Sequence, residues 1–380
     1  MTDELRRQIA AAAHTVVVKV GTRVLTRDDG ALSQDRIERL CAELHAMMEA
    51  GKNVILVSSG AVGAGMNRLN LKSRPADVAQ LQAVAAVGQA RLMQIYDQSL
   101  QRYGRHAAQV LLTVGDFNDR NRYLNVRNTL LALQKFGAVP IINENDTVAV
   151  DELTATFGDN DRLAALVTNL IRAPLLIILS DVAGLYSGDP SLPDSRIVPT
   201  IRQLDEEVYK LVRDRKTGFS KGGMASKLEA ARIVTTAGEN AIIASGRDLG
   251  VLEAIMAGEP VGTLIVGQEK SVSPWKRWLG YTVRPCGRIY VDDGARRAIA
   301  ENGRSLLAIG ITSVDGPFDK GDLIALYDSA GREVARGLSN YSADDLEKIK
   351  GLRSEFITQV LGRFPYDEVI HRDNLAVVGK

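Results

Sequence analysis

The stretch "HTVVVKVGTRVLT", residues 14–26, is an apolar, β-branched run with a single lysine, Lys19, inside it. Its apolar part, "TVVVKV" at residues 15–20, is typical of a buried strand. A buried charge is costly unless it is paired, and the run itself holds no acidic residue. Lys19 therefore needs a partner from elsewhere in the chain, either a structural carboxylate or a bound ligand.

Similar apolar runs alternate with helical patterns through the first two thirds of the chain. Further strands are predicted at 53–59, 107–113, 138–143, 174–180, 240–245 and 261–266. Helices are predicted at 33–52, with Ser33 as cap and Gly51 as stop, and at 75–104, 119–137 and 159–173. This alternation predicts an α/β fold, a largely parallel sheet sandwiched by helices, in which ligands bind at the carboxyl ends of the strands.

The composition of the sequence changes after Val266, where a polar stretch contains both tryptophans and two prolines. We predict a first domain at 14–270, a linker at 271–284, a small, mainly β second domain at 285–363 and a tail at 364–380. Within residues 287–342, short runs separated by Gly and Asp turns surround one short helix, which indicates a β-barrel-like module. Residues 1–14 are not expected to form a targeting segment, because Asp3 and Glu4 interrupt the basic start that such a segment needs. We predict a short surface helix there instead.

Composition excludes several classes of protein. The formal net charge is only +1, so the chain as a whole does not attract nucleic acid, a membrane surface or an acidic partner electrostatically. The two cysteines, Cys41 and Cys286, lie far apart and form no CxxC, which favours a reducing compartment. No run approaches the roughly 18 apolar residues of a membrane helix. The expected location is the cytoplasm, with no membrane partner.

The sequence contains two glycine-rich loops, and the first directly follows the strand predicted at 53–59. "GAVGAG", residues 60–65, could let a ligand approach backbone amides, although packing or a tight turn would explain these glycines equally well. "GFSKGGMASKLEAA", residues 218–231, places glycines before Ser226 and Lys227, an arrangement that suits an anion. It is not a P-loop, because Met224 stands where the lysine belongs. A surface loop with solvated lysines is the alternative.

Polar side chains gather after two further strands. One cluster comprises Asn143, Glu144, Asn145, Asp146, Asp159, Asn160 and Asp161. These residues could hold an ammonium group, orient a lysine or reach a metal through water, and they are also common turn and capping residues. Ser180 and Asp181 end the strand at 174–180, where an α/β sheet contacts nucleotides. Turn chemistry would also explain the glycine and proline that follow them.

This set of groups favours phosphoryl transfer, which depends chiefly on positioning and on neutralising phosphate charge. The four histidines are scattered and have no nucleophile motif beside them. A carboxylate acceptor would need no general base, because it is already a nucleophile. Lys19 and Lys227 would then supply positive charge, with Asp161 as a shared partner in the empty enzyme.

Seven motifs in chain order resemble those of the glutamate 5-kinases of the amino-acid kinase superfamily. They are "VVVKVGTRVLT", "VSSGAVGAGMNRL", "LQAVAAVGQARLMQIY", "INENDTVAV", "FGDNDRLAALV", "LSDVAGLYSGDP" and "KGGMASKLEAA". The segment "GRIYVDDGARRAI" onward is similar to the PUA domain that ends bacterial members. The resemblance implies an amino-acid kinase domain at 14–270, a PUA domain at 285–363, and ATP-dependent phosphorylation of the L-glutamate side-chain carboxylate, the first step of proline biosynthesis.

The resemblance also implies roles for individual residues. It makes Lys19, Lys227 and Asp161 catalytic, and Ser59, Asp146 and Asn160 glutamate contacts. The implied ATP-binding residues are Lys19, Ser180, Asp181, Lys221, Gly222, Gly223, Met224, Ala225, Ser226 and Lys227. Three positions depart from the family: Ser220-Lys221 stands where Gly-Thr is common, and Ser180 replaces a threonine. Mg²⁺ is expected with ATP, since it bridges phosphates while it keeps waters.

Other partners follow from the same resemblance: proline as feedback inhibitor, a homo-oligomer assembled through the kinase domain, and a glutamyl-phosphate reductase that receives the labile product. Aspartate, acetylglutamate and uridylate kinases are rivals, but their segments differ from "KVGTRVLT" and "INENDTVAV". An RNA-binding scaffold is a rival of another class. Residues 284–363 hold 12 Lys plus Arg and 12 Asp plus Glu, a balance that argues against an RNA partner.

Overall fold

The structure is a computed structural model that describes residues 3–27, 30–149, 159–212, 223–268, 285–362 and 366–378. The chain divides into two compact units, Met1–Lys270 and Ser271–Lys380. The segment 271–284, predicted as a linker, lies outside the described residues. Each unit has its own sheet and its own hydrophobic core.

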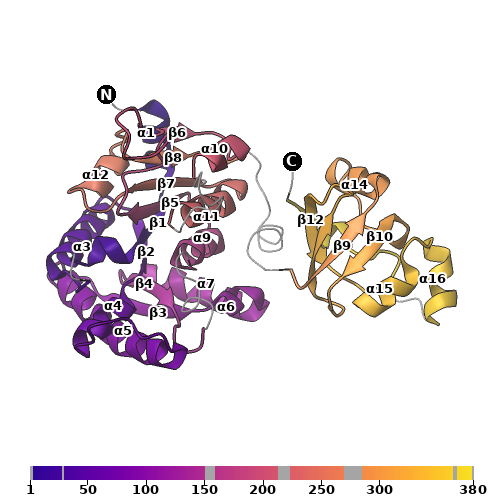
Figure 1. The fold of residues 1–380 in the computed structure, drawn as a ribbon, viewed down its shortest axis with the longest axis horizontal. Coiled ribbons are helices and arrows are strands. Elements are labelled where there is room, and N and C mark those ends of the chain that lie inside the picture. Colours follow the sequence, from indigo (N-terminus) through magenta and orange to yellow (C-terminus); the bar gives the residue numbers. More distant parts are fainter. Residues whose placement is uncertain are drawn as a thin grey trace. The chain divides into compact units, whose positions relative to one another are not determined.

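The described part of the first unit contains an eight-stranded sheet in the order β3-β4-β2-β1-β5-β7-β8-β6 (Figure 1). Its strands are β1 (Thr15–Val20), β2 (Asn53–Ser58), β3 (Ala107–Leu112), β4 (Val139–Glu144), β5 (Leu175–Ser180), β6 (Thr200–Ile201), β7 (Asn240–Ser245) and β8 (Thr263–Ile265). All pairings are parallel except β7 with β8. The largely parallel sheet is therefore confirmed, and the two-residue β6 is the strand that the sequence pattern missed.

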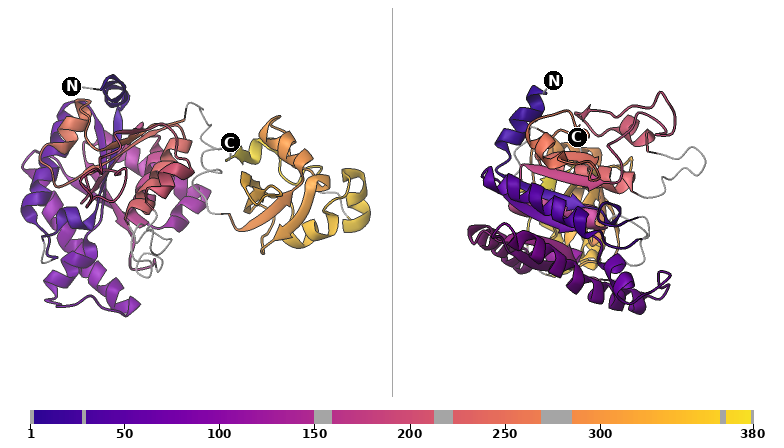
Figure 2. Two further views of the ribbon diagram at one scale, coloured as in Figure 1. Left: turned by 45° about the horizontal axis from the view of Figure 1, so that its top comes forward. Right: turned by 90° about the vertical axis from the view of Figure 1, so that its left-hand side faces the viewer.

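Helices cover both faces of this sheet. They are α1 (Glu4–Ala12), α2 (Thr22–Leu25), α3 (Gln34–Glu49), α4 (Ala61–Arg68), α5 (Val78–Gln101), α6 (Val114–Asn118), α7 (Arg120–Lys135), α9 (Asp159–Ile171), α10 (Glu206–Lys210), α11 (Met224–Thr236) and α12 (Val251–Met256). The helices α7, α9 and α11 pack on one face. The opposite face is covered by α3 and α5, which lie toward the viewer in the right panel of Figure 2.

Side-chain alternation along β1 sets the direction of Lys19. All six residues of β1 are buried, and Val16, Val18 and Val20 belong to the core cluster that includes the apolar side of α3. Because successive strand residues point to opposite faces, Lys19 lies on the face covered by α9. The lysine is thus directed toward the N-terminal turn of α9.

The N-terminal helix α1 lies at the surface, as the sequence predicted, with Glu4, Arg7 and Gln8 exposed, but one of its faces packs into the first unit. Arg6, Ile9 and Ala10 of α1 are buried. The Arg6 guanidinium donates hydrogen bonds to the carbonyl oxygens of Val261, at 2.6 Å, and Gly262, at 3.1 Å. Bound carbonyl groups allow the arginine to be buried, and they fix α1 against the β8 end of the sheet.

Helices α4 and α5 cross with their backbones in direct contact. A Cβ atom at Gly65 would lie 1.8 Å from the carbonyl oxygen of Val84, and one at Gly88 would lie 1.8 Å from that of Ala61. Only glycine fits at these two positions. The crossing fixes the N-terminal end of α4, which follows β2 directly and begins after Gly60, a residue with φ of +112°.

Gly65→Ala is therefore expected to lower the free energy of unfolding by about 3 kcal/mol, because backbone must move to admit the new methyl group. Gly63→Ala, in the same helix, is the matched control. Its Cβ would meet nothing closer than 3.4 Å, so better helix propensity should leave stability unchanged or raise it by up to about 1 kcal/mol. Urea unfolding of both variants checks the contrast, and equal stabilities would refute the close crossing.

The second unit contains a five-stranded sheet in the order β10-β9-β11-β12-β13. Its elements are β9 (Gly287–Val291), α14 (Asp293–Ala300), β10 (Ile311–Asp315), β11 (Leu323–Tyr327), β12 (Glu333–Leu338), α15 (Ala343–Ile349), α16 (Ser354–Leu361) and β13 (Leu375–Val377), with 3₁₀ turns at Ala308–Gly310 and Arg372–Asn374. The mainly β architecture is confirmed.

The one short helix that the pattern of residues 287–342 indicated is α14, and α15 and α16 follow that stretch. One detail of the second unit differs from prediction. The segment 364–380 was predicted as a tail, but β13 pairs antiparallel with β12, and Ile370 is fully buried. Apolar residues such as Val369 and Leu375 explain the difference, since they complete the core of this unit.

In the described part of the chain, no helix is long and apolar enough to cross a bilayer.

Candidate functional site

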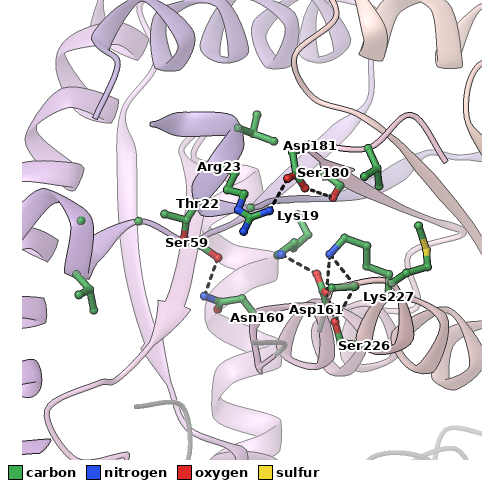
Figure 3. A pocket seen from close by; sticks show the side chains of 18 of the residues that line it. Lys19, Thr22, Arg23, Ser59, Asn160, Asp161, Ser180, Asp181, Ser226 and Lys227 are labelled. Carbon is green, nitrogen blue, oxygen red and sulfur yellow. Dashed lines mark hydrogen bonds and ion pairs between the residues drawn. The ribbon is translucent and has the colours of Figure 1, made fainter. Parts of the chain in front are cut away.

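A cavity of about 650 Å³ opens in the first unit at the carboxyl ends of β1, β2, β4 and β5 (Figure 3). The predicted site residues that line it are Lys19, Ser59, Asp146, Asn160, Asp161, Ser180, Asp181, Gly223, Met224, Ser226 and Lys227. Ala225 is exposed and does not line the cavity. Lys221 and Gly222 lie outside the described residues. Segments up to about 200 residues apart in sequence thus meet at one sheet edge, as parallel topology requires.

Two buried lysines share one buried aspartate at the base of this cavity. Lys19 Nζ lies 2.6 Å from Asp161 Oδ1, and Lys227 Nζ lies 3.2 Å from Asp161 Oδ2. Ser226 donates a further hydrogen bond to Asp161 Oδ2 at 2.8 Å. Figure 3 shows the ammonium groups of both lysines directed at this carboxylate. The arrangement places two positive charges against one negative charge, which leaves a net positive centre suited to an anion.

Local structure accounts for each member of the cluster. Lys19 is the fifth residue of β1, Asp161 lies in the first turn of α9, and Lys227 lies in the first turn of α11. Lys227 Nζ also donates to the carbonyl oxygen of Gly223 at 3.0 Å. Gly223 is the N-cap of α11 and has no side chain to cap the helix, so within the described residues the first backbone amides of α11 could donate to a ligand.

Burial and charge act in opposite directions on these groups. Burial acts to raise the pKa of Asp161, but the charges of Lys19 and Lys227 outweigh it, so this pKa lies below its ordinary value and the carboxylate is ionised. Burial lowers the pKa of Lys227, and Asp161 offsets that effect only in part. The deprotonation of Lys227 is therefore easier than that of an exposed lysine.

A relay of amides borders the other side of the cavity. Asn160 Nδ2 donates to Ser59 Oγ at 3.1 Å and to Asn143 Oδ1 at 3.0 Å. Asn143 Nδ2 in turn donates to Gln89 Oε1 at 2.9 Å. Asp146 lies near the same end of β4, at the cavity wall. Neutral hydrogen-bonding groups and one carboxylate on this side could hold the charged end of an amino acid.

An ion pair lies at the third side of the cavity. Arg23 Nη1 donates to Asp181 Oδ2 at 3.0 Å, and Ser180 Oγ donates to Asp181 Oδ1 at 3.2 Å. Burial acts to raise the pKa of Asp181, but the hydrogen bonds and charge of Arg23 lower it overall. Arg23 is 67% exposed, so water screens this pair, and a ligand could replace either partner at small cost.

The acidic side chains of the cavity do not form a metal site of their own among the described residues. The described residues contain no group of three His, Cys, Asp or Glu side chains placed to hold a metal. Asp161 is engaged by the two lysines and Asp181 by Arg23. This donor set suits Mg²⁺ that keeps several waters and binds phosphate oxygens.

Sequence reasoning left out three residues that the structure brings to this site. Arg23 follows Lys19 by four positions in the opening stretch, and its charge beside a predicted site lysine was a usable signal. Asn143 belongs to the predicted polar cluster, but the sequence gives it no role of its own. Gln89 carries no local signal, because it lies within the long, regular helical pattern of α5.

Comparison with known proteins places this chain in a family. The model of the amino acid kinase family matches residues 14–245, and the PUA domain model matches residues 287–361. Glutamate 5-kinase from Rhodopirellula baltica is 48% identical over 373 residues, which cover 98% of this chain and 96% of that protein. Glutamate 5-kinase from Moorella thermoacetica is 46% identical over 380 residues, all of both chains.

Solved structures also match part of the chain. Carbamate kinase from Giardia lamblia bound to AMP-PNP matches 68% of this chain and 100% of its own, with 19% identity and a TM-score of 0.47. The assignment itself depends on the family models and the full-length relatives. The chain therefore belongs to the amino acid kinase family, within it to the glutamate 5-kinases, and carries a C-terminal PUA domain.

Proposed function

We propose that this chain uses ATP to phosphorylate the side-chain carboxylate of L-glutamate, giving L-glutamyl 5-phosphate and ADP. The observation that carries the proposal is the pair of buried lysines on Asp161, inside a cavity whose other side offers groups for an amino acid. Full-length similarity to proteins named glutamate 5-kinase supports the choice of substrate. We assign this chemistry to residues 14–270.

The reaction needs little covalent help from the protein. A carboxylate oxygen of glutamate attacks the γ-phosphorus of ATP, the bond from that phosphorus to the bridging oxygen breaks, and ADP leaves with the bond's electrons. The acceptor is already an anion, so no general base is required. Lys19 and Lys227 stabilise negative charge on the transferring oxygens, and Asp161 holds both ammonium groups in place before ATP binds.

ATP would bind between the ends of β5 and α11. We assign to it Lys19, Ser180, Asp181, Gly223, Met224, Ala225, Ser226 and Lys227, together with Lys221 and Gly222, which lie outside the described residues. The backbone amides at the start of α11, which no side chain of Gly223 caps, suit phosphate oxygens. Bound Mg²⁺ would supply further positive charge on the phosphates.

Glutamate would bind against Ser59, Asp146 and Asn160. Asp146→Ala is expected to raise KM for L-glutamate roughly 10- to 100-fold, because a hydrogen bond to a charged group contributes about 1.5–3 kcal/mol. KM for ATP should stay within about twofold of the wild-type value, since Asp146 lies at the opposite wall. Steady-state kinetics with each substrate varied separately checks this, and an unchanged KM for glutamate would assign Asp146 a structural role.

The proposal is tested by ADP release with three candidate acceptors: L-glutamate, L-aspartate and N-acetyl-L-glutamate. We expect turnover with L-glutamate alone. The aspartate side chain is one methylene shorter, and the acetyl group removes the ammonium charge that Asp146 would meet. Turnover with another acceptor but not with glutamate would contradict the proposal.

The proposal extends to the first step of proline biosynthesis and to L-proline as feedback inhibitor. It also includes a homo-oligomer assembled through the kinase domain. An acyl phosphate is labile, so we further propose that a glutamyl-phosphate reductase consumes the product. These parts depend on membership of the glutamate 5-kinase family.

A further inference from the structure

The residue behind the amide relay is Gln89, on α5. Gln89 is 8% exposed and is not among the residues that line the cavity. Its Oε1 accepts a hydrogen bond from Asn143 Nδ2 at 2.9 Å, and Asn143 Oδ1 accepts one from Asn160 Nδ2 at 3.0 Å. Among the described residues, the hydrogen bond with Asn143 links Gln89 to the site.

The relay determines which atom Asn160 can offer to a ligand. An amide nitrogen carries two hydrogens, and those of Asn160 Nδ2 are directed at Ser59 Oγ and Asn143 Oδ1. The Asn160 group that remains for a cavity ligand is its side-chain oxygen, a hydrogen-bond acceptor that is buried at the cavity wall. An acceptor suits an ammonium group, whereas the opposite amide orientation would present a donor and repel it.

We propose that Gln89 is a positioning residue for amino-acid binding: its carbonyl oxygen sets the amide orientation of Asn143, and through it that of Asn160, so that Asn160 presents an acceptor to the substrate's ammonium group. This inference rests on the proposed function, since it takes an amino acid as the ligand. It adds a residue outside the cavity to those that select the substrate.

The cost of Gln89 supports this role. Within the described residues, Gln89 Nε2 is buried and has no hydrogen-bond acceptor. An unpaired buried donor lowers stability, so an apolar residue of similar length would suit the helix packing as well or better. The feature that such a residue would lose is the acceptor for Asn143. Without it, Asn143 Nδ2 would itself be unpaired, which favours a turned amide.

The backbone gives Gln89 little freedom to move. The preceding residue, Gly88, lies at the crossing of α4 and α5, where a Cβ atom would fall 1.8 Å from Ala61 O and 2.3 Å from Gly65 N. Helix α5 is therefore fixed against α4 one position before the relay. A rigid support is what a positioning residue requires.

The test compares Gln89→Met, which keeps length and removes the acceptor, with Gln89→Glu, which keeps a carbonyl oxygen for Asn143. Ser99→Ala is the control, because Ser99 is a buried polar residue of the same helix that lies outside the cavity and donates a hydrogen bond to Ile95 O. For Gln89→Met we expect KM for L-glutamate to rise about tenfold or more, with kcat and KM for ATP within about threefold of wild type. Gln89→Glu and the control should stay within about threefold in all constants.

A second readout separates positioning from a general structural effect. Wild type should prefer L-glutamate to glutarate, which lacks the ammonium group, and Gln89→Met should lose about tenfold of that preference. An unchanged KM in Gln89→Met would overturn the inference. So would a lower melting temperature with equal losses for glutamate, glutarate and ATP.

The same experiment distinguishes the two proposals. A wild-type protein without glutamate-dependent turnover would overturn the proposed function and this inference with it. An active wild type whose Gln89→Met variant has unchanged glutamate KM and preference would overturn the inference alone.

Discussion

Lys227→Ala and Lys19→Ala are each expected to lower kcat by about 10³-fold while KM for L-glutamate stays within about threefold. Both ammonium groups lie against Asp161, at 3.2 Å and 2.6 Å. The charge that they stabilise grows on the transferring oxygens in the transition state, so the loss falls on turnover. Steady-state kinetics with saturating ATP measures it.

Lys135→Ala is the matched control for the lysine variants. Lys135 is an exposed residue at the end of α7, outside the cavity, and its removal should leave kcat and both KM values unchanged. Circular dichroism establishes that each variant is folded. A lysine variant that lost glutamate affinity as much as turnover would contradict the assigned role, because it would have removed ground-state binding.

Asp161→Asn is expected to lower the free energy of unfolding by about 3–5 kcal/mol when no nucleotide is present. Asp161 is only 1% exposed, and its removal would leave two buried ammonium groups without their counter-charge. ATP phosphates could replace that charge, so ATP should raise the melting temperature of the variant more than that of the wild type. Asp97→Asn, a half-buried acid of α5 outside the cavity, is the control.

The pH dependence of this variant follows from the signs of the shifts. The pKa of Asp161 is lowered in the folded protein, so its contribution to stability is complete above the ordinary pKa of 3.8 and disappears as pH falls through the lowered value. The difference between wild type and Asp161→Asn should therefore persist at neutral pH and vanish in strong acid. A difference that stayed constant down to acid pH would refute the ion pairs.

Activity in alkaline solution adds a second check on Asp161. Burial lowers the pKa of Lys227 and Asp161 raises it in part, so loss of the carboxylate lowers this pKa further. The alkaline fall of kcat/KM for ATP, which reports the free enzyme, should begin at lower pH in Asp161→Asn than in wild type. An unchanged profile would indicate that Lys227 does not titrate in the measured range.

Much of the fold could be predicted because strands of a parallel sheet are uniform apolar runs. The run at 15–20 coincides with β1, and the lysine inside it required a distant partner, which Asp161 provides. Ser59, Asp146 and Ser180 lie at or just after the carboxyl ends of parallel strands, and these ends meet at one edge of the sheet. Topology alone places such residues together, so their meeting was foreseeable.

Contacts that depend on side-chain geometry could not be predicted in this way. The hydrogen bond from Asn143 to Gln89 joins a strand to a helix 54 residues earlier, and no local pattern encodes it. The burial of Arg6 depends on carbonyl groups about 255 residues away. The short β6 and the late strand β13 carry too few residues for a periodic signal, and tertiary pairing alone defines them.

The account's central claim is direct transfer of the γ-phosphoryl group to a glutamate carboxylate. Hydroxylamine traps an acyl phosphate as a stable hydroxamate, so the decisive measurement is ATP-dependent hydroxamate formation with L-glutamate, L-aspartate and N-acetyl-L-glutamate. The account predicts a hydroxamate with L-glutamate alone, in step with ADP release. ADP release without hydroxamate, or no reaction of the folded protein with any of the three, would contradict it.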